Sequence, residues 1–291
     1  MKLGSRGFSR NLAMLAKKRR RRARKLLLTH INEKNGYHIM TRIIAVVSQK
    51  GGVGKTATTQ NLGWELGQMG QRTLLVDFDP QSNLTSGFGL NLTEPRLTVY
   101  NAMQEPDKAD QCVVNLADHL DILPANLDLA GAELQLGNQM FAERNSWLRD
   151  GLRTLVDQYD FILIDAPPSL GFYTTNALYA ANETLIPLQC EYLAFMAMEQ
   201  LFWIIGEIQK RHAGLSQHRV VLTMRDGRIN ISKDLEEEAR ERFAEMIYQT
   251  AIPENVSIKE APVFGQPVGA YKKNSSGAKA YRALAKEVIN G

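Results

Sequence analysis

The fold of this 291-residue chain is decided by one short stretch, Ser48-Gln49-Lys50-Gly51-Gly52-Val53-Gly54-Lys55-Thr56. It follows the apolar run Ile-Ile-Ala-Val-Val at residues 43–47 and precedes a helical pattern at residues 56–69. Glycines let successive backbone N–H groups turn toward an anion, and a helix that starts there adds its positive dipole end. A strand, a glycine turn and a helix start therefore predict a loop that binds phosphate.

The loop carries two lysines and departs from the usual spacing of nucleotide-binding loops. Gln49 stands where a glycine is usual, and Lys50 follows it. Lys55 fits the role of reaching the β and γ phosphates, and the Thr56 hydroxyl fits that of binding Mg²⁺. Glycine turns that contain a lysine also occur without any ligand. The complete string between a strand and a helix nevertheless favours nucleotide binding.

Repeated strand-then-helix units follow along the chain. Apolar runs predict strands at residues 73–77, 120–123, 161–164, 184–188 and 219–224, and one that runs through Ile252. Helical patterns cover residues 128–136, 146–158, 193–210, 232–246 and 276–288, while residues 83–97 form a loop that we expect to move with nucleotide state. We therefore predict the α/β fold class, with a single, mainly parallel sheet that is covered by helices on both faces.

Two later blocks share the order of known nucleotide motifs: Leu-Leu-Val-Asp-Phe-Asp-Pro-Gln at residues 74–81 and Phe-Ile-Leu-Ile-Asp-Ala-Pro-Pro-Ser at residues 161–169. Together with the phosphate loop they resemble the ParA family of deviant Walker-box ATPases, which are P-loop NTPases related to MinD and to the nitrogenase iron protein. The resemblance covers residues 40–291. It implies ATP and Mg²⁺ as ligands and an ATPase that is weak alone and stimulated by a partner.

The resemblance also implies roles for individual residues. Lys50 would reach the phosphates of a second subunit in an ATP-dependent homodimer, and Asp79 would orient the attacking water. The metal and its bound waters would be held by Thr56, Asp77 and Asp165. The nucleotide contacts would be Lys50, Gly51, Gly52, Val53, Gly54, Lys55, Thr56 and Ala57 at the phosphates, and Met224, Pro253 and Asn255 around the base.

Non-specific DNA binding is expected from the same family. The block Arg-Asp-Gly-Arg-Ile-Asn at residues 225–230 resembles a family motif whose arginine contacts DNA phosphates. Two further arginines of the family are absent, because Glu254 and Ser257 stand in their places. Phosphate contacts require positive charge rather than base-edge geometry, so lysines can replace them. The candidates are Arg225, Arg228, Lys259, Lys272 and Lys273, and the alternative is an ordinary solvated surface.

Residues 1–39 differ in composition from the rest of the chain. They hold twelve Lys or Arg residues and a single acid, Glu33, although the net charge of the whole chain is only +4. We therefore expect a basic, disordered extension before an acidic ATPase domain at residues 40–291. Three interpretations of the extension stay open: translation that really starts at Met40, an electrostatic arm for DNA or anionic lipid, and an organelle presequence.

Composition also excludes several classes of protein. Cys112 and Cys190 lie far apart without a C-x-x-C pair, which argues against a zinc site, a redox motif or a disulfide framework. No apolar run approaches the length of a membrane span. We therefore expect a cytoplasmic protein without stable membrane association, and the resemblance to the ParA family implies that it associates with the nucleoid.

The resemblance favours a partition ATPase that positions a plasmid, a chromosome or another large cargo. A ParB-like centromere-binding protein or cargo adaptor would stimulate hydrolysis. One alternative is a MinD-like ATPase of the division site, which needs a basic amphipathic helix after the domain. A second is an iron-sulfur carrier of the nitrogenase-iron-protein type, which needs paired interface cysteines.

Overall fold

The computed structural model describes residues 40–135, 141–189, 191, 194–226 and 230–291. The basic extension lies outside the described residues. The described residues all belong to one unit, residues 40–291, which everything below concerns.

The described residues form one eight-stranded sheet. Its strands are β1 (Arg42–Val46), β2 (Thr73–Asp77), β3 (Val114–Ala117), β4 (Leu120–Leu123), β5 (Phe161–Asp165), β6 (Glu183–Gln189), β7 (Gln217–Arg225) and β8 (Ile247–Pro253). Their order is β3-β4-β2-β5-β1-β6-β7-β8, and every neighbouring pair is parallel except β3 with β4. The predicted mainly parallel α/β fold is confirmed.

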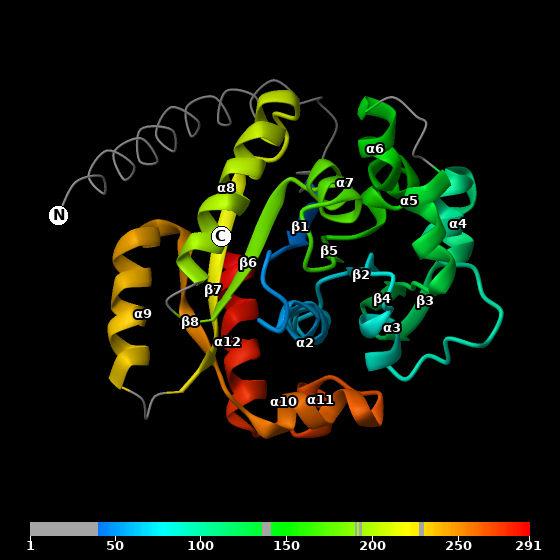
Figure 1. The fold of residues 1–291 in the computed structure, drawn as a ribbon. Coiled ribbons are helices and arrows are strands. Elements are labelled where there is room, and N and C mark those ends of the chain that lie inside the picture. Colours follow the sequence, from blue (N-terminus) through cyan, green and yellow to red (C-terminus); the bar gives the residue numbers. More distant parts are fainter. Residues whose placement is uncertain (1–39, 136–140, 190, 192–193, 227–229) are drawn as a thin grey trace, which may run out of the picture. The chain divides into compact units, whose positions relative to one another are not determined.

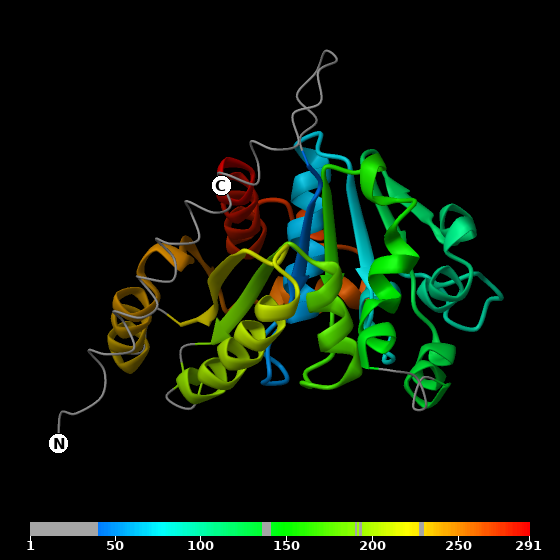
Figure 2. The same cartoon turned by 90° about the horizontal axis from the view of Figure 1, so that it is seen from above.

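Helices connect the strands and cover both faces of the sheet (Figures 1 and 2). The α-helices are α2 (Lys55–Gln68), α3 (Asn83–Gly87), α4 (Val99–Gln104), α5 (Ala132–Gln135), α6 (Phe141–Leu152), α7 (Phe172–Ala180), α8 (Ala194–Arg211), α9 (Asn230–Phe243), α10 (Val256–Glu260), α11 (Val268–Tyr271) and α12 (Ser276–Asn290). Short 3₁₀ turns are η1 (Pro106–Cys112), η2 (Leu127–Gly131), η3 (Val156–Gln158), η4 (Ala244–Met246) and η5 (Ala261–Phe264). In the described part of the chain, no helix combines the length and the apolar character that a membrane crossing requires.

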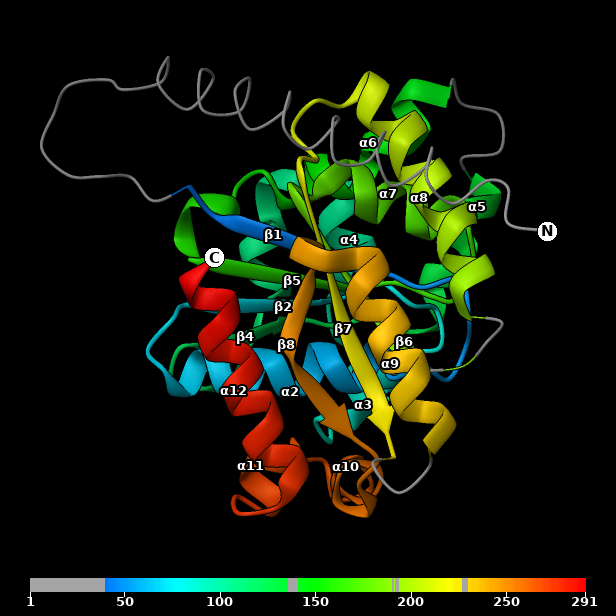
Figure 3. The ribbon, with the colours of Figure 1, turned by 90° about the vertical axis from the view of Figure 1, so that its left-hand side faces the viewer.

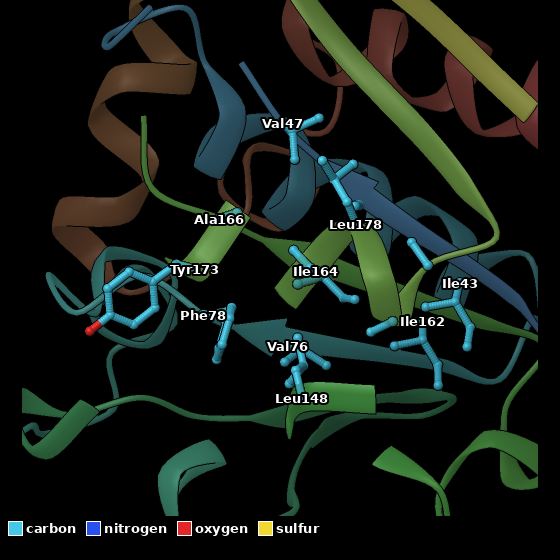
Figure 4. Close-up of a cluster of buried hydrophobic side chains, with 14 of the residues drawn as sticks. Ile43, Val47, Val76, Phe78, Leu148, Ile162, Ile164, Ala166, Tyr173 and Leu178 are labelled. Atoms are coloured by element: carbon cyan, nitrogen blue, oxygen red, sulfur yellow. The ribbon is translucent and has the colours of Figure 1, made fainter. Parts of the chain in front are cut away.

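Alternate residues of β1 belong to two separate cores, because successive side chains of a strand point to opposite faces. Ile43 and Ala45 pack in the core beneath α4, α6, α7, α8 and α9 (Figure 4). Ile44 and Val46 pack in the core beneath α2, α3 and α12. Figure 3 shows α2 and α12 on the side of the sheet opposite to α7 and α8. The central strands are therefore buried on both faces, as their continuous apolar runs predicted.

The structure differs from the predicted elements where the segments are short. The expected loop at residues 83–97 begins with α3, and the expected helix at residues 128–136 is divided between η2 and α5. The strand β3 and the helices α4 and α7 were not predicted. The strand β3 is only partly buried, with intermediate exposure at three of its four residues. A partly buried strand does not require a continuous apolar run, and such a run is the pattern from which the central strands were predicted.

Side chains of two helices form hydrogen bonds with backbone groups of the edge strand β8. The Glu287 carboxylate of α12 accepts hydrogen bonds from the N–H groups of Gln249 and Thr250, each at 2.8 Å. Arg240 of α9 donates to the carbonyls of Tyr248 and Gln249 at 3.2 and 3.0 Å. These contacts occupy backbone groups near an edge of the sheet, where unpaired groups attract further strands.

Gly63 allows α2 to lie close to β2, and its replacement tests this packing. A Cβ at this position would stand 2.4 Å from the Cδ2 atom of Leu75, which is fully buried. We expect Gly63→Ala to lower the free energy of unfolding by roughly 1 to 2 kcal/mol, because overpacking outweighs the better helix propensity of alanine. Urea denaturation of the full chain measures the change.

Gly206 of α8 is the matched control, since a Cβ there would meet no atom within 4 Å. Gly206→Ala should raise the free energy of unfolding by about 0.5 to 1 kcal/mol, the ordinary gain from helix propensity. A stabilised Gly63→Ala variant would show that α2 can move away from β2 without cost.

Candidate phosphate-binding and hydrolysis site

The loop between β1 and α2 has the backbone that its sequence predicted. Gly52 and Gly54 have φ angles of 76° and 87°, in the left-handed region where side chains other than glycine are strained. Gly54 is the N-cap of α2, and its carbonyl accepts the first helical hydrogen bond from the N–H of Thr58 at 2.8 Å. The loop thus ends at a fourteen-residue helix whose positive dipole end faces it.

Two carboxylates lie side by side beyond the phosphate loop. Asp77 and Asp165 end β2 and β5, are paired in register, and are 0% and 1% exposed. Burial raises the pKa of both carboxyl groups, and the Asp77 charge raises the pKa of Asp165 further. Lys55 is also buried; burial lowers its pKa, while Asp165 and Asp79 oppose that shift. The buried ammonium group of Lys55 therefore interacts with more than one carboxylate, those of Asp165 and Asp79.

Asp165 fits the expected role of a metal-site carboxylate. One of its oxygens accepts a hydrogen bond from the Thr59 hydroxyl at 3.4 Å, and the other is buried without a hydrogen-bond partner among the described residues. The nearby Thr56 side chain lowers the pKa of this carboxyl group and so opposes part of the effect of burial. Mg²⁺ is usually held by one or two carboxylates, waters and phosphate oxygens rather than by a complete protein cage. Among the described residues, no group of three or more His, Cys, Asp or Glu residues that could hold a metal occurs.

Asp79 lies in the turn after β2 and is 7% exposed. Its carboxylate accepts a hydrogen bond from the Gln81 N–H at 2.9 Å. A cavity of about 270 Å³ borders this turn and is lined by Asp79, Pro80, Gln81, Glu133, Pro167, Pro168, Ser169, Gly171, Phe172 and Tyr173.

Lys50 faces a different environment from Lys55. Its ammonium group forms an ion pair with Glu191 of the same chain, and the two side chains are 37% and 46% exposed. Next to it, the Gln49 side chain donates to Gln200 at 2.6 Å. The two lysines of the loop are thus separated, one buried beside the carboxylates and one at the exposed rim.

A larger pocket of about 560 Å³ opens beside the loop, a size typical of ligand sites. It brings together six residues predicted to contact nucleotide, namely Gly54, Thr56, Ala57, Met224, Pro253 and Asn255. Met224 has a φ angle of 53°, a strained conformation of the kind found at ligand sites. The Asn255 side chain caps α10 at the Ser257 N–H and donates to Ser276, so it also fixes the pocket wall.

Several lining residues were not predicted from sequence. Gln60, Asn83, Ser86, Gly87, Thr223 and Tyr281 also line the pocket. Gln60 donates from its Nε2 to the Gly87 carbonyl at 2.6 Å, and Thr223 donates to the Val53 carbonyl at 2.8 Å. The helical stripe of α2 carries no signal that distinguishes Gln60. Residues 83–97 were predicted only as a loop that moves with nucleotide state, without any residue named as a contact.

The predicted DNA-binding residues are not equivalent in the structure. Arg225 forms an ion pair with Glu236 at 2.6 Å, and Lys259 forms one with Glu254 at 2.8 Å. Lys272 and Lys273 are exposed. Arg228 lies outside the described residues. Two of the candidate cations therefore face acids of their own chain.

Comparisons with known proteins agree on one family. A family profile described as an AAA domain matches residues 41–217, more than half of the chain. The chain is 42% identical to the sporulation initiation inhibitor protein Soj of Bacillus subtilis, over 86% of this chain and 98% of Soj. It is 41% identical to the chromosome partitioning protein ParA of Caulobacter vibrioides, over 86% of this chain and 94% of that protein.

A solved structure with the same fold contains ligands. The cobyrinic acid a,c-diamide synthase of Mycobacterium smegmatis, with a bound ATP analogue and magnesium, is 33% identical with a TM-score of 0.75, over 86% of this chain and 94% of that one. Its ligands support nucleotide and Mg²⁺ binding in this fold. The sequence similarity to Soj and ParA extends over nearly their full lengths and includes the phosphate loop, and this chain therefore belongs to the ParA family of partition ATPases.

Proposed function

We propose that this ATPase works as an ATP-dependent homodimer that binds DNA without sequence preference and positions a large cargo. A ParB-like centromere-binding protein or another cargo adaptor would stimulate its weak hydrolysis. The observation that carries the proposal is the separation of the two loop lysines: Lys55 is buried beside Asp165, whereas Lys50 stands at an exposed rim. A cation at a rim is available to the phosphates of a second chain.

Hydrolysis of ATP requires neutralised phosphate charge and a water held in line more than covalent participation by the protein. In the proposal, the loop N–H groups and Lys55 bind the phosphates, and the base lies near Met224, Pro253 and Asn255. Thr56, Asp77 and Asp165 would hold Mg²⁺ and its bound waters, and the metal would supply positive charge to the phosphate oxygens. Asp79 orients the attacking water.

Lys50 completes the site only when two chains meet. In the proposed dimer it leaves Glu191 and contacts the phosphates bound by the other subunit. Hydrolysis and release of the γ phosphate remove part of that interaction, so the dimer loosens. Bound ATP thus acts as the signal for association, and an adaptor that stimulates hydrolysis sets how long the dimer lasts.

The DNA-binding residues in the proposal are Arg225, Arg228, Lys259, Lys272 and Lys273. A dimer presents two copies of this surface, which makes binding depend on nucleotide. Nucleoid association would follow from the same surface, and the proposal places the protein in the cytoplasm. The ion pair of Lys259 with Glu254 is exposed on both sides and therefore weak, so a phosphate oxygen can replace its carboxylate. Glu236, the partner of Arg225, is only 13% exposed and also pairs with Arg240, so Arg225 is the more firmly held of the two cations.

The proposed role of Lys50 predicts that its loss affects dimerisation but not ATP binding. Lys50→Ala should bind ATP as the parent does but fail to form an ATP-dependent dimer, because Lys55 still contacts the phosphates within its own chain. Lys55→Ala should instead weaken ATP binding roughly 10- to 100-fold, the effect of removing a charged hydrogen bond. Light scattering after size exclusion, with ATP and Mg²⁺, measures the dimer.

Glu191→Gln is the matched control for Lys50→Ala, since it breaks the same ion pair and leaves the lysine in place. This variant should still dimerise with ATP. An ordinary ATP-dependent dimer of Lys50→Ala would exclude the proposed role of Lys50 between subunits.

The role of Asp79 predicts a dimer that persists. Asp79→Ala should lower the rate of hydrolysis at least 100-fold, because it removes water orientation while phosphate and metal binding remain. Its dimer should outlast that of the parent in ATP and Mg²⁺, as phosphate release and light scattering will show. Asp157→Ala, at an exposed acid of η3, is the control and should turn over normally. Turnover at the parental rate by Asp79→Ala would remove Asp79 from the catalytic role.

The DNA surface predicts binding that depends on nucleotide and salt. Unrelated duplexes should bind with ATP but not with ADP, also when the chain starts at Met40. The double variant Lys272→Glu, Lys273→Glu and the variant Arg228→Glu should weaken binding equally for all sequences. The logarithm of the binding constant should also fall less steeply with the logarithm of salt concentration, by about one unit of slope for each phosphate that the variant no longer binds.

Lys108→Glu, at an exposed lysine of η1 that is not among the proposed DNA contacts, is the matched control and should bind as the parent does. Binding that ignores nucleotide and disappears with residues 1–39 would assign DNA affinity to the basic extension and contradict the proposed surface.

A further inference from the structure

The carboxylate of Asp77 has both oxygens engaged by protein groups. One oxygen accepts the Asp79 N–H at 3.3 Å. The other accepts both the N–H and the hydroxyl of Thr85, at 2.8 and 2.6 Å. Asp77 is fully buried, and hydrogen bonds to a buried charged group are strong and costly to remove.

Thr85 lies in α3 and is also fully buried. Its hydroxyl donates to Asp77 and at the same time accepts a hydrogen bond from the Ala125 N–H at 3.0 Å. A single hydroxyl therefore joins the end of β2, the helix α3 and the segment that follows β4. The hydroxyl donates one hydrogen bond and accepts another, and among side chains of similar size only serine also offers a hydroxyl that can form both; the thiol of cysteine is a weaker donor and acceptor.

The chain between these hydrogen bonds carries the catalytic candidate Asp79. The turn closes with a hydrogen bond of 2.8 Å from the Ser82 N–H to the Asp79 carbonyl. Ser82 has a left-handed backbone with a φ angle of 53°, and its buried hydroxyl has no hydrogen-bond partner among the described residues. Such a conformation costs of order 1 kcal/mol or more and persists only where the surroundings hold it. Asp77 holds this turn at both ends, through the N–H groups of Asp79 and Thr85.

Helix α3 also forms one wall of the nucleotide pocket. Asn83, Ser86 and Gly87 line that pocket, on either side of Thr85 in the sequence. Gln60 of α2 bonds to the Gly87 carbonyl and so joins the same wall to the helix that starts at the phosphate loop. The water-orienting candidate and the pocket wall are therefore connected through Thr85.

We infer that Thr85 is a positioning residue for ATP hydrolysis: through Asp77 it fixes the turn that carries Asp79 relative to the pocket wall formed by α3. The inference rests on the proposed role of Asp79. Thr85 acts on the reaction through Asp77 and the turn, by limiting where the Asp79 carboxylate can lie. A displacement of about 1 Å at a reacting group can lower a rate about 100-fold.

Thr85→Val tests this inference because valine has the shape of threonine without the hydroxyl. Asp77 then has one donor fewer and the Ala125 N–H has no acceptor, while the hydrogen bond from the residue-85 N–H stays. We expect kcat to fall about tenfold or more, with KM for ATP and the affinity for ATP within about threefold of the parent. Thr85→Ser keeps both hydroxyl hydrogen bonds and should recover most of the rate.

Thr73→Val is the matched control, at a fully buried threonine at the other end of β2 whose hydroxyl donates to the Gln71 carbonyl at 2.9 Å. It should leave kcat unchanged even where it lowers the melting temperature. If Thr85→Val does not fold, Thr85→Cys replaces it: its weaker S–H donor should give a kcat below that of Thr85→Ser. Equal rates for these two variants would overturn the inference, as would a parental kcat for Thr85→Val.

A double variant separates the action of Thr85 from that of Asp79. If Thr85 acts by placing Asp79, then Thr85→Val should lower kcat no further in the Asp79→Ala background. Reductions in kcat that multiply would show that Thr85 acts on another part of the protein and would overturn the inference. The proposed function fails in different ways: the parent would not hydrolyse ATP, or Asp79→Ala alone would hydrolyse it at the parental rate.

Discussion

The site depends on the burial of two carboxylates next to one lysine. Because β2 and β5 are parallel and in register, Asp77 and Asp165 must end at the same edge of the sheet. Neither charge is solvated, so each needs donors or cations from the protein or from a ligand. Thr85 supplies donors to Asp77, whereas Asp165 keeps an unpartnered oxygen near Lys55 and Thr56. The unpartnered oxygen of Asp165 therefore favours the binding of a cation, and a metal ion that is bound to nucleotide phosphates would supply one.

The same edge collects the other parts of the site, since ligands bind at the carboxyl ends of the strands in α/β sheets. The phosphate loop follows β1, the Asp79 turn follows β2, and Met224 lies at the end of β7. In the proposed site, the long helix α2 and the short helix α3 would set the distance between phosphates, base and water. Buried hydrogen bonds, such as those of Thr85 with Asp77 and of Gln60 with the Gly87 carbonyl, connect these helices to the site.

The sequence predicted those features that depend on neighbouring residues. The strand β2 was predicted with its observed bounds, because an apolar run fills its centre and an acid marks its end. The loop glycines were predicted because their spacing is local. The role of Thr85 was not, since it depends on Asp77 eight residues earlier and on Ala125 forty residues later. The pair of Lys50 with Glu191 joins residues 141 positions apart, and no pattern in the sequence indicates it.

The side-chain hydrogen bonds to the edge strand β8 have a consequence for how easily two copies of the chain could separate after they associate. Ladder hydrogen bonds between two edge strands would hold two chains together whatever nucleotide they carried. Glu287 and Arg240 occupy backbone groups of β8, so this edge offers fewer free partners to a neighbouring strand. In the proposed cycle of association and separation, contact between copies would then be left to surfaces that nucleotide controls.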